Sequence, residues 1–145
     1  MYNYSEKSMI KKKALQDKKK QERTSEDSME IFEGRLPPSA VELEVQVLGA
    51  IMLDNMVFSD IVDIIKPEFL YKNAHRTIFS AFVNIDGRNE ELDALSVIEE
   101  LKLMGKLDAV GGVEYILKIT ESIASSTSAK RYARIIYEKY VLREL

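Results

Sequence analysis

The sequence predicts an all-α fold, a compact bundle of about five to six helices. After about residue 36, apolar residues recur at the three- and four-residue spacing that is typical of amphipathic helices. Tyr and Phe supply all of the aromatic content, so the core should consist mainly of Leu, Ile, Val and Met. Candidate capping residues precede several helical segments and glycines follow them. A chain of 145 residues supports about one domain.

Charge divides the chain into two parts. Residues 1–35 contain nine Lys or Arg and seven Asp or Glu, a net charge of +2, whereas residues 36–145 contain twelve and seventeen, a net charge of −5. We expect a flexible, charged N-terminal extension over 1–35 and a helical globular domain over 36–125. An acidic domain is a poor candidate for autonomous DNA binding, so any DNA contact should be indirect. A basic arm at Lys11–Arg23 that touches nucleic acid is the alternative.

The start of the domain carries two conflicting signals. Valine and leucine alternate with polar residues over 41–47, which taken alone is a strand pattern. Ser39 and Glu42, however, complete an S-x-x-E capping box, which favours a helix from about Ser39. The residues expected on its wide apolar face are Val41, Val45, Val47, Leu48, Ile51 and Met52. A helix with so wide an apolar face should be nearly central in the bundle.

Two further helices are predicted before residue 90. The first is short and ends before Pro67, and its inner residues are Met56, Ile61, Ile64 and Ile65. The connection after it should bring Phe69 and Leu70 into the core. The second helix should be capped by Asn73 and stopped by Gly87. Its inner stripe is His75, Ile78, Phe79 and Phe82.

A glycine-rich stretch, GKLDAVGG, separates the next two predicted helices. Asp93 is a suitable N-cap for the first of them, whose inner residues are Ala94, Ile98 and Leu101. The stretch lacks the Lys-Ser/Thr pair that a Walker A loop needs after its second glycine, so it should not hold a nucleotide. We assign Gly105, Gly111 and Gly112 a structural role in the turn, because glycine adopts left-handed backbone conformations readily.

The last predicted helix runs from about Ala129 to Leu145 and has two apolar stripes. The first consists of Ala129, Tyr132, Ala133, Ile136 and Tyr140, and the second of Ile135, Val141, Leu142 and Leu145. One domain core needs only one such stripe. The helix is therefore either inside the core or shared with another chain or segment.

No catalytic, cofactor-binding or metal-binding site is predicted. The chain has no Cys, and its single histidine, His75, lies on an apolar stripe, so we expect a core histidine with a satisfied ring. The acidic pairs 90–91 and 99–100 are adjacent in sequence, do not share a helix face, and are expected to be solvated surface. No apolar run approaches the ~20 residues that span a bilayer, so a soluble, cytoplasmic protein is expected.

Four groups of residues occur in an order and spacing that resemble a known family. In PPSAVELEVQVLGAIMLDN they are Pro37, Pro38, Glu44, Val47, Leu48 and Gly49, and in FLYKNAHRTIF they are Phe69, Tyr71, His75, Ile78 and Phe79. In LDALSVIEELKLMGKLDAVGGVEYI they are Asp93, Leu95, Leu101, Gly105, Leu107, Gly111, Gly112 and Tyr115. Tyr132-Ala133 before Ile136 completes the set. Over about 110 positions the chain resembles the N-terminal domain of bacterial replicative DNA helicases of the DnaB type.

The resemblance implies an all-helical collar domain in a ring-shaped hexamer built from three dimers. Its implied partners are other copies of itself, primase and, in some lineages, a helicase loader. Residues 126–145 would be the truncated first arm of a helical hairpin. The residues expected at an oligomer or partner interface are Tyr132, Ile135, Ile136, Tyr140, Val141 and Leu142.

The resemblance also implies that this chain is not itself an enzyme. ATP and Mg²⁺ would bind only in a separate motor domain of a longer ATP-dependent helicase. Val45 departs from the family, which often has a polar residue at this position. The alternative function is a free-standing helical adaptor, or a DNA-associated regulator with a basic N-terminal arm. A reading frame that continues past Leu145 into a G-x-x-x-x-G-K-[ST] motif would favour the helicase.

Overall fold

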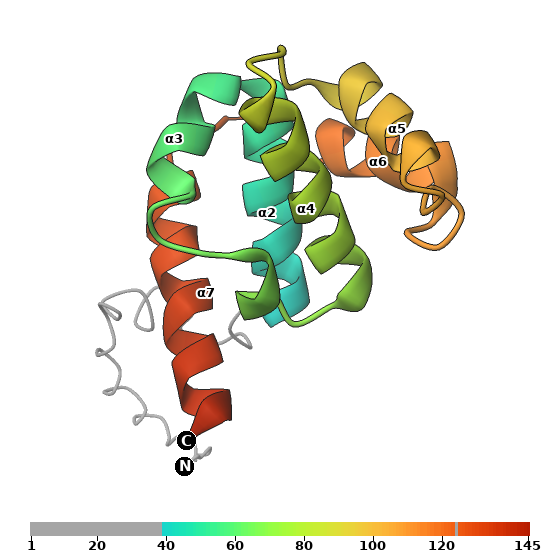
Figure 1. Cartoon of the computed structure of the whole chain (residues 1–145). Helices are drawn as coiled ribbons and strands as arrows, with labels where there is room; N and C mark the ends of the chain where they lie inside the picture. Colours follow the sequence, from blue (N-terminus) through green and yellow to red (C-terminus); the bar gives the residue numbers. More distant parts are fainter. Residues whose placement is uncertain (1–38, 124) are drawn as a thin grey trace. The chain divides into compact units, whose positions relative to one another are not determined.

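The computed structural model describes residues 39–123 and 125–145, which include six α-helices and no strand (Figure 1). The helices are α2 (Ala40–Leu53), α3 (Phe58–Ile61), α4 (Asn73–Gly87), α5 (Ala94–Leu103), α6 (Gly112–Glu121) and α7 (Ala129–Glu144). Two 3-10 turns, Asn55–Val57 and Pro67–Phe69, lie on either side of α3. The predicted all-α fold is confirmed. The predicted extension over 1–35 and its basic arm lie outside the described residues.

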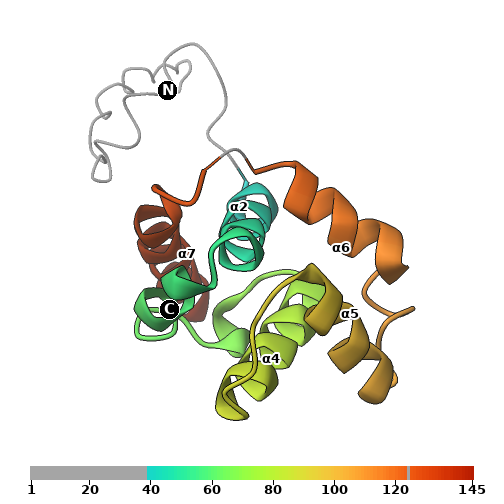
Figure 2. The same cartoon turned by 90° about the horizontal axis from the view of Figure 1, so that it is seen from above.

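Helix α2 is the central element, as its wide apolar face predicted. It packs against α7, α6 and α4, and Figure 2 shows it between α7 and α6. The capping box is present, because the Ser39 hydroxyl accepts the Glu42 amide at 3.1 Å and the Glu42 carboxylate accepts the Ser39 amide at 2.9 Å. Of the two conflicting signals, the capping box indicated the observed helix and the strand pattern was misleading. Eight of its residues are buried: Leu43, Glu44, Val47, Leu48, Gly49, Ala50, Ile51 and Met52.

The predicted second helix is divided, and one of its predicted core residues was wrong. The Asp54 carboxylate accepts the Met56 amide at 3.2 Å and starts a 3-10 turn before α3. The turn leaves Met56 78% exposed and buries Phe58 instead. The Phe58 ring contacts those of Phe79 and Phe82, with centroid distances of 5.6 and 6.2 Å. A helical wheel drawn through this turn misplaces Met56 because the turn changes the rotation per residue.

Helix α4 has the predicted buried stripe, but both of its predicted end signals were wrong. His75, Ile78, Phe79 and Phe82 are all buried. Lys72, not Asn73, is the N-cap residue, and the Asn73 side chain instead accepts a hydrogen bond from Arg76 at 3.3 Å. At the other end Gly87 is the last helical residue, and the left-handed residue is Asn89, with φ of 58°. The Glu90 amide bonds to the Ile85 carbonyl at 3.2 Å, which completes a Schellman-type stop.

The glycine turn between α5 and α6 is confirmed. Gly105, Gly111 and Gly112 have φ values of 68°, 115° and 78°, a region that other residues rarely adopt. The Lys106 amide bonds to the Leu101 carbonyl at 2.9 Å, so Gly105 closes a Schellman-type end of α5. A Cβ atom on Gly111 would lie 2.8 Å from the Tyr115 Cβ. The glycines thus allow α6 to start close to the end of α5.

Glu100 corrects the prediction that the acidic pair 99–100 is solvated. Helix α5 begins at the predicted N-cap Asp93, and it buries Glu100 against α4. The Glu100 carboxylate accepts hydrogen bonds from Arg88 at 2.6 Å and from Asn84 at 3.0 Å. The Arg88 guanidinium lowers the pKa of Glu100 below its ordinary value, and the same contact raises the pKa of Arg88. The ion pair ties the C-terminal end of α4 to α5.

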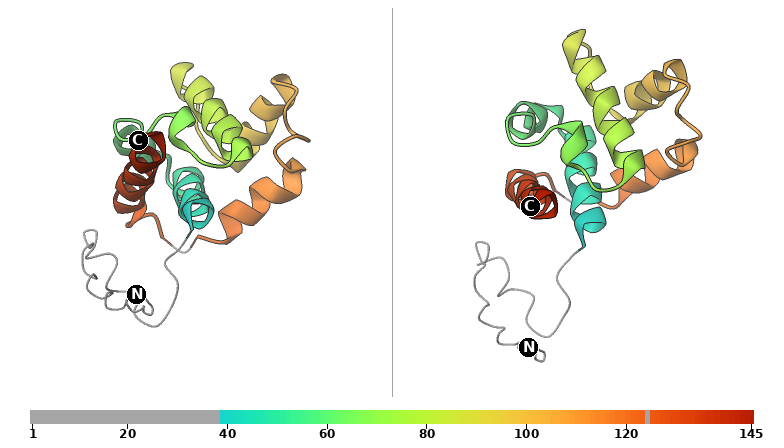
Figure 3. Two further views of the ribbon diagram at one scale, coloured as in Figure 1. Left: turned by 90° about the horizontal axis from the view of Figure 1, so that it is seen from below. Right: turned by 60° about the horizontal axis from the view of Figure 1, so that its bottom comes forward.

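Helix α7 closes the bundle beside α2, as the two views of Figure 3 show. Its N-terminal half buries Ala129, Ala133 and Ile136 in the core. The C-terminal half is more exposed, and its last residues leave the core altogether. Among the residues that the structure describes, no helix is long and apolar enough to cross a membrane.

Candidate functional site

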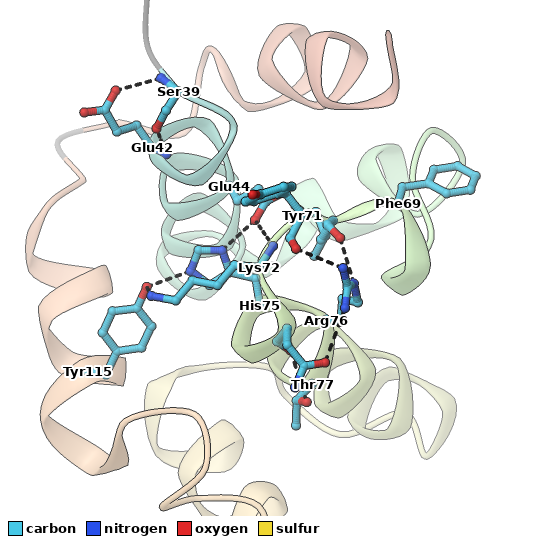
Figure 4. Close-up of polar contacts among 12 residues, drawn as sticks. Ser39, Glu42, Glu44, Phe69, Tyr71, Lys72, His75, Arg76, Thr77 and Tyr115 are labelled. Atoms are coloured by element: carbon cyan, nitrogen blue, oxygen red, sulfur yellow. Dashed lines mark hydrogen bonds and ion pairs between the residues drawn. The ribbon is translucent and has the colours of Figure 1, made fainter. Parts of the chain in front are cut away.

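A buried polar network joins α2, α4 and α6 inside the domain (Figure 4). The Glu44 Oε1 atom lies 2.7 Å from His75 Nδ1, and His75 Nε2 lies 2.6 Å from the Tyr115 hydroxyl. The Glu44 carboxylate also accepts the backbone amides of Tyr71 and Lys72. Glu44 and His75 are both 0% exposed. A carboxylate with no exposure is stable only with this many donors, since burying an unpaired charge is costly.

Both ring nitrogens of His75 have partners in the Glu44–His75–Tyr115 network. With a neutral ring, His75 Nδ1–H donates to Glu44 and Nε2 accepts from the Tyr115 hydroxyl. The expectation of a core histidine with a satisfied ring is confirmed. Within 39–123 and 125–145 no group of three or more His, Cys, Asp or Glu side chains could hold a metal ion.

The connection between α3 and α4 is held by side chains from three helices. Glu44 of α2 accepts its amides, as described above, and Arg76 of α4 donates to the carbonyls of Leu70 and Tyr71 at 2.8 and 2.9 Å. Arg143 of α7 donates to the Phe69 carbonyl at 3.1 Å. Side chains of three helices therefore satisfy backbone polar groups of this connection, which lies at the surface of the domain.

The six predicted interface residues of α7 do not lie on one surface. Ile136 is 1% exposed and belongs to the domain core, so that part of the prediction was wrong. Tyr140 is half-buried and stacks on Phe69 at a centroid distance of 4.3 Å. Leu142 is 69% exposed. The remaining three are half-buried: Tyr132, Ile135 and Val141.

The geometry of α7 also divides the second predicted stripe. Residues seven apart on a helix return to nearly the same direction, so Ile135 and Leu142 share one side. Val141 is next to Leu142 in sequence and points about 100° away from it. Ile135 is half-buried and packs against the domain core, whereas Leu142 is exposed and lies toward the first turn of α2.

A groove lies where the C-terminal turns of α7 meet the first turn of α2. Its volume is about 420 Å³, and its lining includes Ala40, Val41, Tyr71, Lys139, Leu142 and Arg143. The Arg143 guanidinium lies 5.3 Å from the centroid of the Tyr71 ring. Of this set, only Leu142 is among the residues that the sequence predicts at an interface. The four-residue spacing of Lys139 and Arg143 puts both cations on one face of the helix and was the available signal.

The network residues also had a signal in the sequence. Glu44 is a charged residue between Leu43 and Val47 on the most apolar helix of the chain, and such a residue is rarely fully buried unless it is paired. The family pattern included Glu44, His75 and Tyr115, but sequence spacing does not show that they meet. The structure brings them together from three helices.

Comparison with known proteins identifies the family of this fold. Residues 36–138 match the family described as DnaB-like helicase N terminal domain. The chain is 37% identical over 116 residues to the replicative DNA helicase DnaB of Geobacillus stearothermophilus, an alignment that covers 80% of this chain and 26% of the relative. It is 39% identical over 110 residues to the DnaB helicase of Rhodothermus marinus, covering 76% of this chain and 12% of the relative. The chain thus spans about a quarter or less of the length of these relatives.

A solved structure agrees with the sequence relatives. The crystal structure of the N-terminal domain of DnaB helicase from Mycobacterium tuberculosis superposes with a TM-score of 0.71 at 32% identity, and the alignment covers 76% of each chain. The sequence match and the structural match concern the same domain. The chain therefore belongs to the family of the DnaB-like helicase N-terminal domain.

Proposed function

We propose that this chain is the non-catalytic N-terminal collar domain of a hexameric replicative DNA helicase. It would mediate ring assembly, as a trimer of dimers, and would dock primase and in some cases a helicase loader. ATP and Mg²⁺ would bind to a separate motor domain of the parent enzyme, in the cytoplasm. Support comes from the family match and from the relatives, which are named as replicative helicases.

One observation carries the proposed assembly role. Helix α7 uses one side to complete the domain core through Ala133 and Ile136, and its last turns present Leu142 and Leu145 at the surface. Leu142 is 69% exposed, so its apolar side chain does not contribute to the core of this domain. An apolar face beyond the needs of the core is typical of a helix that packs against a second chain or segment.

The test is the self-association of the 145-residue chain, measured by sedimentation velocity at increasing concentration. We expect weak dimerisation, and Leu142→Ser should shift the equilibrium toward monomer. Leu103→Ser is the matched control, because Leu103 lies on α5 and is 82% exposed. A strict monomer at high concentration, or equal dimerisation of both variants, would count against the assembly role. Titration with purified primase, with the same two variants, tests the docking role.

A further inference from the structure

The groove between α2 and α7 combines an apolar floor with two cations. The apolar floor consists of Ala40 and Val41 of α2 and Leu142 of α7. Tyr71, which is 56% exposed, borders the groove from the connection before α4. These residues come from three separate elements, and the hydrogen bond from Arg143 to the Phe69 carbonyl holds two of those elements together.

The charges beside this floor select what the groove can bind. Lys139 and Arg143 lie one helical turn apart on α7, and like charges at this spacing repel each other modestly. A carboxylate placed between them would remove that repulsion and gain attraction from both. Glu144 points away from the side of α7 that holds Lys139 and Leu142, whereas Glu138 precedes Leu142 by one helical turn and lies on the same side as Leu142. A bound carboxylate would therefore lie beside Lys139 and Arg143 rather than beside Leu142.

A second copy of the chain is a poor occupant for the cationic side of the groove. A two-fold symmetric contact uses the same patch on both subunits, so it would bring Lys139 and Arg143 of both copies into one interface. A nucleic acid is also a poor occupant, because its backbone binds to extended rows of cations and residues 36–145 carry a net charge of −5. A volume of about 420 Å³ accommodates a few side chains and not a folded domain.

We propose that the groove between α2 and α7 docks a short amphipathic segment of another protein, with apolar anchors for the floor and acidic residues for Lys139 and Arg143. Such segments bind as helices whose apolar residues, three or four positions apart, enter a groove. The acidic flank gives orientation and specificity, because a cationic flank would meet two like charges. The proposed assembly of the ring is not required for this docking.

The probe is a fluorescein-labelled 16-residue peptide with Leu at every third or fourth position and Glu on its other face. Two control peptides replace either every Glu with Lys or every Leu with Ser. We expect the anisotropy to rise on titration with the 145-residue chain for the Leu/Glu peptide and to change little for the controls. Equal binding of the Lys control would overturn the proposal, because the cations would then have no role.

Variants of the chain test whether the peptide binds at this groove. Lys139→Glu should weaken binding of the Leu/Glu peptide at least tenfold, whereas Lys130→Glu, an equal charge change elsewhere on α7, should leave it unchanged. Leu142→Ser should also weaken binding, and Leu103→Ser should not. Amide chemical shifts of the ¹⁵N-labelled chain should change most at Ala40, Val41 and Arg143. Shift changes centred on another face, or equal effects of the two Lys variants, would overturn the proposal.

Discussion

The two ends of α4 each carry a buried carboxylate contact, and the two contacts differ in how far water is excluded. At the N-terminal end, Glu44 meets His75, and neither residue is exposed. At the C-terminal end, Glu100 meets Arg88, whose side chain remains 45% exposed. The first contact joins three helices through one ring, and the second joins α4 only to α5.

This difference shows that burial of a carboxylate does not by itself measure how much the fold depends on it. When both partners are buried, as Glu44 and His75 are, removal of one leaves the other without water to replace it. When the partner is half in solvent, water takes over the lost contact at small cost. Loss of the Glu44 contact at the N-terminal end of α4 should therefore lower the free energy of unfolding more than loss of the Glu100 contact at the C-terminal end.

The largest expected effect is that of Glu44→Ala. The change leaves the His75 ring and the amides of Tyr71 and Lys72 unpaired, and each buried donor left unsatisfied costs about 1 to 3 kcal/mol. Urea denaturation followed by circular dichroism would measure it. Glu99→Ala, an exposed acidic residue of α5, is the matched control and should change stability by less than about 0.5 kcal/mol. A similar small effect at both positions would refute the assigned importance of the buried network.

Gly111→Val should have the second-largest effect on stability. A branched side chain at φ of 115° is strained, and its Cβ would collide with Tyr115, the network residue at the start of α6. We expect a loss of about 1 to 3 kcal/mol, measured by thermal melting. Gly87→Ala is the matched control, because no atom lies within 4 Å of its added Cβ and its φ is not left-handed. That control should stabilise the domain by about 0.4 to 1 kcal/mol, and an unchanged melt for Gly111→Val would contradict the prediction.

Tyr115→Phe separates the hydrogen bond from the packing of the ring. It removes the hydroxyl from His75 Nε2 and keeps the aromatic ring, so the expected loss is about 1 kcal/mol. The ¹⁵N chemical shifts of the His75 ring should report the change at Nε2 directly. A ring nitrogen shift that is the same in both proteins would mean that the Tyr115 hydroxyl does not bond to it in solution.

The smallest expected effect is the acid dependence of the Glu100–Arg88 pair. The pKa of Glu100 is lowered in the folded state, so the folded chain binds fewer protons here than the unfolded chain. Its contribution to stability is complete above the ordinary pKa of 4.5 and is lost as pH falls through the lower folded value. Arg88 stays charged throughout this range. Thermal melts from pH 7 to pH 3 should fall less steeply for Glu100→Gln than for the parent chain, and identical slopes would count against the pair.

Much of the fold could be predicted from local patterns. Capping residues and left-handed glycines act over a few neighbouring positions, so Ser39, Asp93 and Gly105 marked helix ends in the sequence as they do in the structure. The buried stripe of α4 followed from helical spacing for the same reason. The family resemblance was likewise carried by the order of short motifs and is confirmed by the matched residues 36–138.

The helical fold and the family could thus be predicted from the residues alone, because both depend on short motifs and on the order of those motifs. The burial of Glu100, of Phe58 in place of Met56, and of Ile136 could not be predicted in this way, because it depends on how the helices pack. Only the tertiary structure shows that Glu44, His75 and Tyr115 meet. Each of these contacts depends on which helix packs against the residue. The neighbouring residues in the sequence do not identify that helix.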